Sequence, residues 1–165
     1  MSRDPALPLP PAELDRIARW RTAGERIVFT NGVFDLLHRG HVEYLEASRA
    51  LGDRLVVGVN SDASVRRLKG PARPIVGQDD RRALVAALRS VDLAIVFEED
   101  TPLRLIREVA PDVLVKGGDW AVEHIVGREF VEGRGGRVLN VPLSEGLSTT
   151  NLAERIAAGK SALDP

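Results

Sequence analysis

The feature that most constrains the fold is a glycine-bearing turn in residues 28–41, where an apolar run meets a helical pattern. The apolar run ends at Gly32, and the segment closes on two histidines, His38 and His41. In residues 42–51 apolar side chains recur at helical spacing, which predicts a helix. A strand that ends where a helix begins presents backbone N–H groups and the positive end of a helix dipole to an anion. The segment therefore predicts a phosphate site in an α/β fold.

The residue types in this turn suit that chemistry. Gly32 and Gly40 carry no Cβ, so the backbone can come close to a ligand. His38 and His41, three residues apart, project from one side of the first helical turn and offer two N–H donors. A zinc site is the alternative interpretation, but His124 is the other histidine and there is no cysteine, so a zinc set would need carboxylates. We therefore expect no metal bound by a dedicated set of side chains.

Composition limits the classes of protein that remain. A chain of 165 residues fits one domain, which we predict at 11–160 after a flexible, proline-rich arm at 1–10. The net charge of −1 gives no reason to expect nucleic-acid or membrane binding. The absence of cysteine excludes disulfides and thiolate catalysis. No apolar run approaches the roughly 20 residues that span a bilayer, and the arm lacks a signal-peptide core, so we predict a cytoplasmic protein.

Strand and helix patterns alternate along the chain. This alternation predicts an α/β fold: a Rossmann-like, doubly wound parallel sheet of five strands with helices on both faces. Ligands in such sheets bind beyond the carboxyl ends of the strands, at the switch point. The predicted strands are 27–30, 54–60, 92–97, 113–115 and 137–141. The predicted helices are 11–22, 42–51, 62–68 capped by Ser61, 78–90, a helix capped by Thr101 and ending at Val109, 124–131, and 148–158.

Two further loops carry polar side chains toward the same end of the sheet. Residues 69–77 contain two prolines and two glycines, which prevent regular structure, so we expect little to hold this loop in place. We predict that Lys69 and Arg73 contact phosphate, whereas the neighbouring Arg66 and Arg67 are better explained as a solvated basic surface.

The second loop, residues 116–120, follows a predicted strand. Lys116, Gly117, Asp119 and Trp120 combine a cation, a glycine, a carboxylate and an aromatic ring, a composition expected of a ribose and base pocket. The alternative is a plain tight turn with the Trp120 ring packed in the core.

Two blocks of this sequence resemble a known family. Residues 32–41, Gly-Val-Phe-Asp-Leu-Leu-His-Arg-Gly-His, resemble the signature of the HxGH nucleotidylyltransferases of the cytidylyltransferase-like superfamily. Residues 147–151, Leu-Ser-Thr-Thr-Asn, resemble the Ser-Thr-Thr motif that these enzymes carry near the C-terminus. The resemblance implies a catalytic set, an ATP-binding set and an acceptor-binding set. These are respectively His38, His41 and Lys69; Thr30, Asn31, Gly32, Phe34, Gly40, Lys116, Gly117, Asp119, Ser148, Thr149 and Thr150; and Asp35, Lys69, Arg73 and Trp120.

Within the superfamily the sequence is most similar to the D-glycero-β-D-manno-heptose 1-phosphate adenylyltransferases. Residues 29–35, 59–65, 67–70, 73–75, 97–102 and 113–119 carry this likeness. It implies transfer of AMP from ATP to a sugar 1-phosphate, with Mg²⁺ held mainly by the triphosphate. It also implies a homodimer. Many members are fused to a sugar kinase domain, for which this chain has no room, so we expect a separate kinase upstream.

Other functions remain open at this stage. The cytidylyltransferase branch, which acts on glycerol 3-phosphate or related alcohol phosphates, carries tryptophan where this chain has Trp120. An FMN adenylyltransferase and a non-catalytic nucleotide sensor are two further alternatives. The sensor has no use for both histidines and the Ser-Thr-Thr motif. A dinucleotide oxidoreductase needs G-x-G-x-x-G after the first strand, and residues 32–41 do not supply it.

Overall fold

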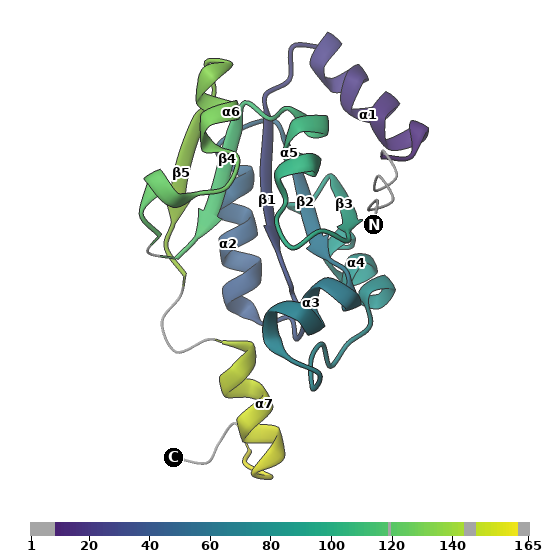
Figure 1. Cartoon of the computed structure of the whole chain (residues 1–165), viewed down its shortest axis with the longest axis vertical. Helices are drawn as coiled ribbons and strands as arrows, with labels where there is room; N and C mark the ends of the chain where they lie inside the picture. Colours follow the sequence, from purple (N-terminus) through teal and green to yellow (C-terminus); the bar gives the residue numbers. More distant parts are fainter. Residues whose placement is uncertain (1–8, 119, 144–147, 162–165) are drawn as a thin grey trace, which may run out of the picture.

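The computed structural model describes residues 9–118, 120–143 and 148–161, and their centre is a parallel sheet of five strands (Figure 1). The strand order is β3-β2-β1-β4-β5, so the chain builds outward from β1 in both directions. The strands are β1 (Ile27–Gly32), β2 (Arg54–Asn60), β3 (Leu93–Phe97), β4 (Val113–Gly117) and β5 (Arg137–Val141). The helices are α1 (Pro11–Thr22), α2 (Arg39–Arg49), α3 (Asp62–Lys69), α4 (Gln78–Ala86), α5 (Leu103–Val109), α6 (Arg128–Gly133) and α7 (Thr149–Ala157), with a 3₁₀ turn η1 at Val122–His124.

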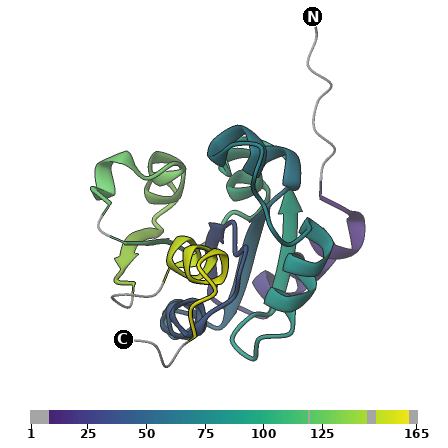
Figure 2. The same cartoon turned by 90° about the horizontal axis from the view of Figure 1, so that it is seen from below.

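Both faces of the sheet are buried, because successive side chains of a strand point to opposite sides. Phe29 and Val56 pair in register and join one apolar cluster, with side chains from α1, α5 and α6. Val28 and Leu55 pair one residue earlier and join a second cluster, with side chains from α2 and α4. Seen from below, the layers lie on either side of the strands (Figure 2). The predicted doubly wound, Rossmann-like α/β fold is confirmed.

The strand order places a switch point between β1 and β4. From β1 the chain continues to β2 and β3 on one side, then crosses back to β4 and β5 on the other. At such a point the loops that leave neighbouring strands diverge, which opens a crevice at the carboxyl edge of the sheet. In Figure 1 this edge lies at the lower end of β1, and α7 lies beyond it.

Several predicted boundaries were wrong. Strand β1 runs to Gly32, two residues beyond its predicted end, and helix α4 ends at Ala86 rather than at residue 90. Thr101 does not cap α5, because the helix begins at Leu103 and the cap position belongs to Pro102.

The predicted helix 124–131 is split into η1 and α6. Gly127, between them, has φ = 90°, a left-handed conformation that L side chains rarely adopt. A Cβ at Gly127 would also lie 2.7 Å from Cδ1 of Ile106. The glycine therefore interrupts the helix and lets the chain pack closely on α5.

The N-terminal boundary also differs from the prediction. Residues 1–8 of the predicted arm lie outside the described residues, but Leu9 is 6% exposed and belongs to the core cluster. Its backbone N–H donates to Oε2 of Glu108 at 2.8 Å. Packed structure therefore begins at least as early as Leu9. Within the part of the chain that the structure describes, no helix is long and apolar enough to cross a membrane.

A buried arginine connects three segments at the carboxyl edge. Arg81 on α4 is 0% exposed, and each of its three guanidinium nitrogens makes a hydrogen bond. Nε donates to the carbonyl of Val76 at 2.8 Å and Nη1 to the carbonyl of Val33 at 2.6 Å. Nη2 donates to Oδ1 of Asp62 at 2.8 Å. Arg81 thus joins the turn after β1, the loop after α3 and the start of α3.

We predict that Arg81→Ala lowers the free energy of unfolding by about 3 kcal/mol. Three hydrogen bonds are lost, each worth about 1 kcal/mol, and a large buried side chain leaves a cavity. Arg89→Ala is the matched control, because the Arg89 side chain is 95% exposed and its change should stay below about 0.5 kcal/mol. Urea unfolding of both variants measures the difference, and equal stability of the two would contradict the role of Arg81.

Candidate active site

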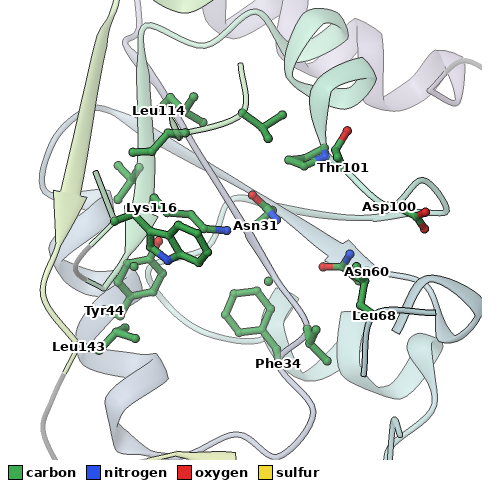
Figure 3. Close-up of a pocket in the computed structure, with 18 of the residues that line it drawn as sticks. Asn31, Phe34, Tyr44, Asn60, Leu68, Asp100, Thr101, Leu114, Lys116 and Leu143 are labelled. Atoms are coloured by element: carbon green, nitrogen blue, oxygen red, sulfur yellow. The ribbon is translucent and has the colours of Figure 1, made fainter. Parts of the chain in front are cut away.

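A cavity of about 650 Å³ opens at the carboxyl ends of β1, β2 and β4 (Figure 3). Its volume lies in the range of small-molecule sites. The turn after β1, the end of α3 and the loop after β4 all contribute to its lining. The lining includes Asn31, Gly32, Val33, Phe34, His41, Tyr44, Asn60, Leu68, Lys69, Asp100, Thr101, Leu114, Lys116, Gly117, Trp120, His124 and Leu143.

The turn after β1 has an uncommon backbone conformation. Phe34 has φ = 51°, which few residues other than glycine adopt and which persists only where the surroundings enforce it. A Cβ at Gly32 would lie 3.0 Å from Cε2 of Phe34, so any other residue there would crowd the ring. The edge of the Phe34 ring meets the His41 ring, with centroids 5.3 Å apart. The turn therefore packs against His41 and holds it at the cavity.

The two histidines of the signature stack on each other. Their ring centroids are 3.8 Å apart with an interplanar angle of 25°. The backbone N–H of His38 donates to Nδ1 of His41 at 3.3 Å. Because Nδ1 accepts this bond, a neutral His41 carries its proton on Nε2 and presents an N–H donor. His41 lines the cavity, whereas His38, the N-cap of α2, is not among the lining residues.

Burial makes both rings neutral at pH 7. The pKa of His41 is lowered to about 4, chiefly by burial and to a smaller extent by the nearby His38. Burial also lowers the pKa of His38 from its ordinary 6.5. In the free protein the pair is therefore a set of hydrogen-bond donors and not a pair of cations.

Lys116 and Trp120 occupy the other side of the cavity. The Lys116 ammonium lies 5.5 Å from the centroid of the Trp120 ring, a cation–π contact. Figure 3 shows the ammonium pointing toward the middle of the cavity, near Asn31. Burial lowers the pKa of Lys116. Trp120 is 55% exposed and lines the cavity, so the alternative of a core tryptophan is wrong. Asp119 lies outside the described residues.

Asp35 binds the loop after α3 from inside the protein. Its carboxylate is buried, pairs with Nε of Arg73 at 2.6 Å and accepts the backbone N–H of Ile75 and Val76 at 2.8 and 2.9 Å. Burial alone would raise the pKa of Asp35, but the two backbone donors and Arg73 hold it below its ordinary value. The expectation that little holds residues 69–77 in place is therefore wrong for residues 73–76.

The C-terminal motif reaches the signature turn. Oγ1 of Thr149 donates to the carbonyl of Leu36 at 3.5 Å, across 113 positions of sequence. Oγ of Ser148 accepts the backbone N–H of Asn151 at 3.0 Å and caps α7, so the helix begins one residue after its predicted start. Thr150 is exposed. The first turns of α2 and α7, both of which carry N–H groups without intrahelical partners, thus lie at one edge of the sheet.

Some predicted residues lie away from the cavity. Thr30 is fully buried, and its hydroxyl is hydrogen-bonded to the hydroxyl of Tyr44. Gly40 is buried in the first turn of α2. Asp35 and Arg73 form an ion pair with each other, so either of them could contact a substrate directly only if the loop moved.

The sequence did not single out several residues that line the cavity. Asn60 ends β2, Tyr44 lies on α2, and Leu143 follows β5. Asn60 carries the one usable signal, since it is a polar residue that ends an apolar strand.

The donor groups around the cavity limit which metal ion it could hold. Among residues 9–118, 120–143 and 148–161, no group of three histidine or acidic side chains lies close enough to hold an ion. The carboxylate nearest the turn, Asp35, is already saturated by Arg73 and two backbone donors. A magnesium ion would fit only if it arrived with oxygen ligands of its own, such as those of a triphosphate.

We predict that His41 in the free protein shows no titration midpoint between pH 5.5 and 8, because its pKa is about 4. Binding of a triphosphate should raise that midpoint, since nearby negative charge favours the imidazolium. Imidazole C–H shifts followed by NMR, and assigned with His41→Gln, measure both values. A midpoint near 6.5 in the free protein would show that His41 is not desolvated.

Comparison with known proteins agrees with this geometry. The sequence model of the family described as Cytidylyltransferase-like matches residues 29–155. The chain is 55% identical over 145 residues to the bifunctional protein HldE of Magnetococcus marinus, covering 88% of this chain and 30% of that protein. It is 58% identical over 139 residues to the bifunctional protein HldE of Geotalea uraniireducens, covering 84% and 28%. The chain thus spans less than a third of these relatives.

Solved structures give the same result. The lipopolysaccharide core biosynthesis protein of Thermoplasma volcanium superposes with a TM-score of 0.60 at 37% identity, covering 73% of this chain and 98% of that one. The pantoate-beta-alanine ligase of Francisella tularensis superposes with a TM-score of 0.58 at 14% identity, covering 85% and 70%, which speaks for the fold alone. The family match over residues 29–155 includes both the turn after β1 and the start of α7. The chain therefore belongs to the cytidylyltransferase-like family and is a nucleotidyltransferase.

Proposed function

We propose that this chain transfers AMP from ATP to a sugar 1-phosphate, foremost D-glycero-β-D-manno-heptose 1-phosphate, and releases pyrophosphate. The observation that carries the proposal is the contact between Thr149 and Leu36, at the edge where His41 faces the cavity. It joins two motifs, each suited to phosphate, that lie 113 positions apart. The likeness of the chain to the HldE proteins supports the acceptor.

The reaction needs no protein nucleophile. A phosphate oxygen of the acceptor, already ionised at neutral pH, attacks the α-phosphorus of ATP. The new P–O bond forms as the bond between the α-phosphorus and the α,β-bridging oxygen breaks, and pyrophosphate leaves with that electron pair. Catalysis then rests on positioning and on stabilisation of the charge that develops on the α-phosphoryl oxygens.

The neutral histidines supply directed donors for that charge. His41 presents Nε2–H to the cavity, because its Nδ1 accepts the backbone N–H of His38. Hydrogen bonds to a developing charge in a site that excludes water stabilise the transition state more than the ground state. His38 stacks on His41 and holds its ring in place.

The cations and helix ends bind the remaining phosphates. Lys69 ends α3, lines the cavity and would bridge the acceptor phosphate and the α-phosphate. Arg73 has one buried guanidinium nitrogen, Nη2, without a hydrogen-bond partner among the described residues, and this nitrogen could donate to an anion only after the loop moves. Ser148, Thr149 and the first turn of α7 would hold the β- and γ-phosphates. Mg²⁺, bound by the triphosphate oxygens, would neutralise part of their charge.

ATP is proposed over CTP on sequence grounds. Asn31 precedes Gly32 in the turn where the cytidylyltransferase branch has tyrosine, and the Arg-Thr pair that this branch carries ahead of its Ser-Thr-Thr motif is missing. Trp120, the Lys116 ammonium and Leu143 would surround the base. Trp120 is the residue shared with the cytidylyltransferase branch, so a cytidylyltransferase is the second candidate. The homodimer and the separate kinase stay predictions.

We predict a higher kcat/KM with ATP than with CTP, and with heptose 1-phosphate than with glycerol 3-phosphate or flavin mononucleotide. Pyrophosphate release with the six pairs of substrates measures this directly. A higher value with CTP would assign the chain to the cytidylyltransferase branch, and no release with any pair would support a nucleotide sensor.

We predict that His41→Ala lowers kcat by about a hundredfold or more while ATP still binds, as for the loss of a donor to developing charge. Arg39→Ala is the matched control, because Arg39 stands between the two histidines but its side chain is 75% exposed and pairs with Glu43. Steady-state rates and ATP titrations of both variants provide the comparison. A His41→Ala enzyme with more than half the wild-type rate would remove His41 from the mechanism.

A further inference from the structure

The proposed nucleotide contacts use one side of the cavity, beside Lys116 and Trp120. The opposite side, lined by Asn60, Leu68 and Thr101, is unused by them and is called the second limb below. Figure 3 shows Tyr44, Lys116 and Leu143 on one side of the cavity and Asn60 and Thr101 on the other. Leu68, half exposed, lines the same second side. The two limbs meet at the turn after β1, where the histidines lie.

Asn60 projects into this limb from the end of β2. In the sheet register Asn31 lies opposite Gly58. A Cβ built on Gly58 would lie 3.2 Å from the Cβ of Asn31, so the glycine leaves room for the Asn31 side chain. Two residues beyond Gly58, Asn60 is the next side chain on that face. Nδ2 of Asn60 donates to Oγ of Ser64 at 3.1 Å, which fixes the amide and leaves its oxygen as an acceptor for a ligand.

Thr101 enters the limb from the segment between β3 and α5. Its hydroxyl caps no helix and makes no side-chain hydrogen bond within the described residues. The segment before it is held from α3: Oγ of Ser64 donates to the carbonyl of Glu99 at 3.1 Å, and Arg67 pairs with Asp100 at 2.6 Å. Thr101 is therefore a free hydroxyl on an anchored segment.

The chemistry of the limb matches a polyhydroxylated ring. The amide oxygen of Asn60 accepts from a ligand hydroxyl, the Thr101 hydroxyl both donates and accepts, and Leu68 offers an apolar surface for the C–H face of a sugar.

We propose that Asn60 and Thr101, with Leu68 beneath the ring, bind the hydroxylated skeleton of the acceptor and select a sugar phosphate over a simple alkyl phosphate. This assignment rests on the proposed function, which supplies the acceptor. It places the two substrates in separate limbs: the base beside Lys116 and Trp120, and the sugar between β2 and α5. The acceptor phosphate then lies near Lys69, between the limbs.

The test is an equilibrium titration of heptose 1-phosphate, and of propyl phosphate for comparison, into protein saturated with α,β-methylene ATP. Thr101→Val removes one hydroxyl at constant shape and should raise the Kd of the sugar phosphate about three- to tenfold, the value of one neutral hydrogen bond. Asn60→Leu should do the same. The Kd of propyl phosphate should change less than twofold in either variant, because that ligand has no hydroxyl.

Controls separate this effect from general damage. Thr22→Val removes an exposed hydroxyl on α1 that bonds only the Ala18 carbonyl, and it should leave both Kd values unchanged. Circular dichroism checks that Asn60→Leu is folded; if it is not, Thr101→Val alone decides. Unchanged sugar-phosphate affinity in the folded variants, or an equal loss for propyl phosphate, would overturn the assignment.

The same titration distinguishes the two levels of inference. If the sugar phosphate binds with the predicted dependence on Thr101 but no pyrophosphate forms with ATP, the proposed reaction fails and the sugar subsite stands. If catalysis occurs and the variants bind like wild type, the reaction stands and the subsite fails. If the wild-type protein binds no sugar phosphate, both fail.

Discussion

The active edge of this protein depends on two buried ionic side chains, Asp35 and Arg81, that hold the turn after β1 against the loop after α3. Removing charged groups from water is costly unless each is fully hydrogen-bonded. Here Arg81 donates from all three nitrogens, and Asp35 accepts from Arg73 and two backbone N–H groups. Since both bridge the same two segments, the turn that carries the histidines and the loop that follows Lys69 form one unit.

That unit explains how an uncommon backbone conformation persists at Phe34. A left-handed φ costs on the order of 1 kcal/mol, which the surrounding bonds can offset. In this conformation the Phe34 ring fills the space left open by Gly32 and packs against the His41 ring. Burial favours the neutral form of His41, so the role proposed for it rests on a directed N–H and not on positive charge. The positive charge comes from Lys69 and Lys116, on either side of the histidine.

The sheet was predictable because it follows from local periodicity, and the glycine-bearing loops after β1 and β4 were found from their composition. The apolar runs at β2 and β5 gave the bounds of these strands, and the last helix was found within one residue of its observed ends. The failures have a common cause in tertiary contact. Gly127 interrupts a helical pattern because it packs on Ile106. Asp35, predicted to contact the acceptor, instead pairs with Arg73, 38 residues away. Neither partner is visible from sequence spacing.

The division of the cavity into two limbs follows from the fold itself. At the switch point, the strands on the β4 side contribute Lys116 and Gly117, while those on the β2 side contribute Asn60. A reaction between two phosphates needs both substrates to end at one point while their remaining parts stay apart. A parallel sheet with a glycine turn at its central strand meets that need, because β1 alone borders both halves. Under the proposed assignment, changes in the β2 limb would alter the acceptor without disturbing the nucleotide.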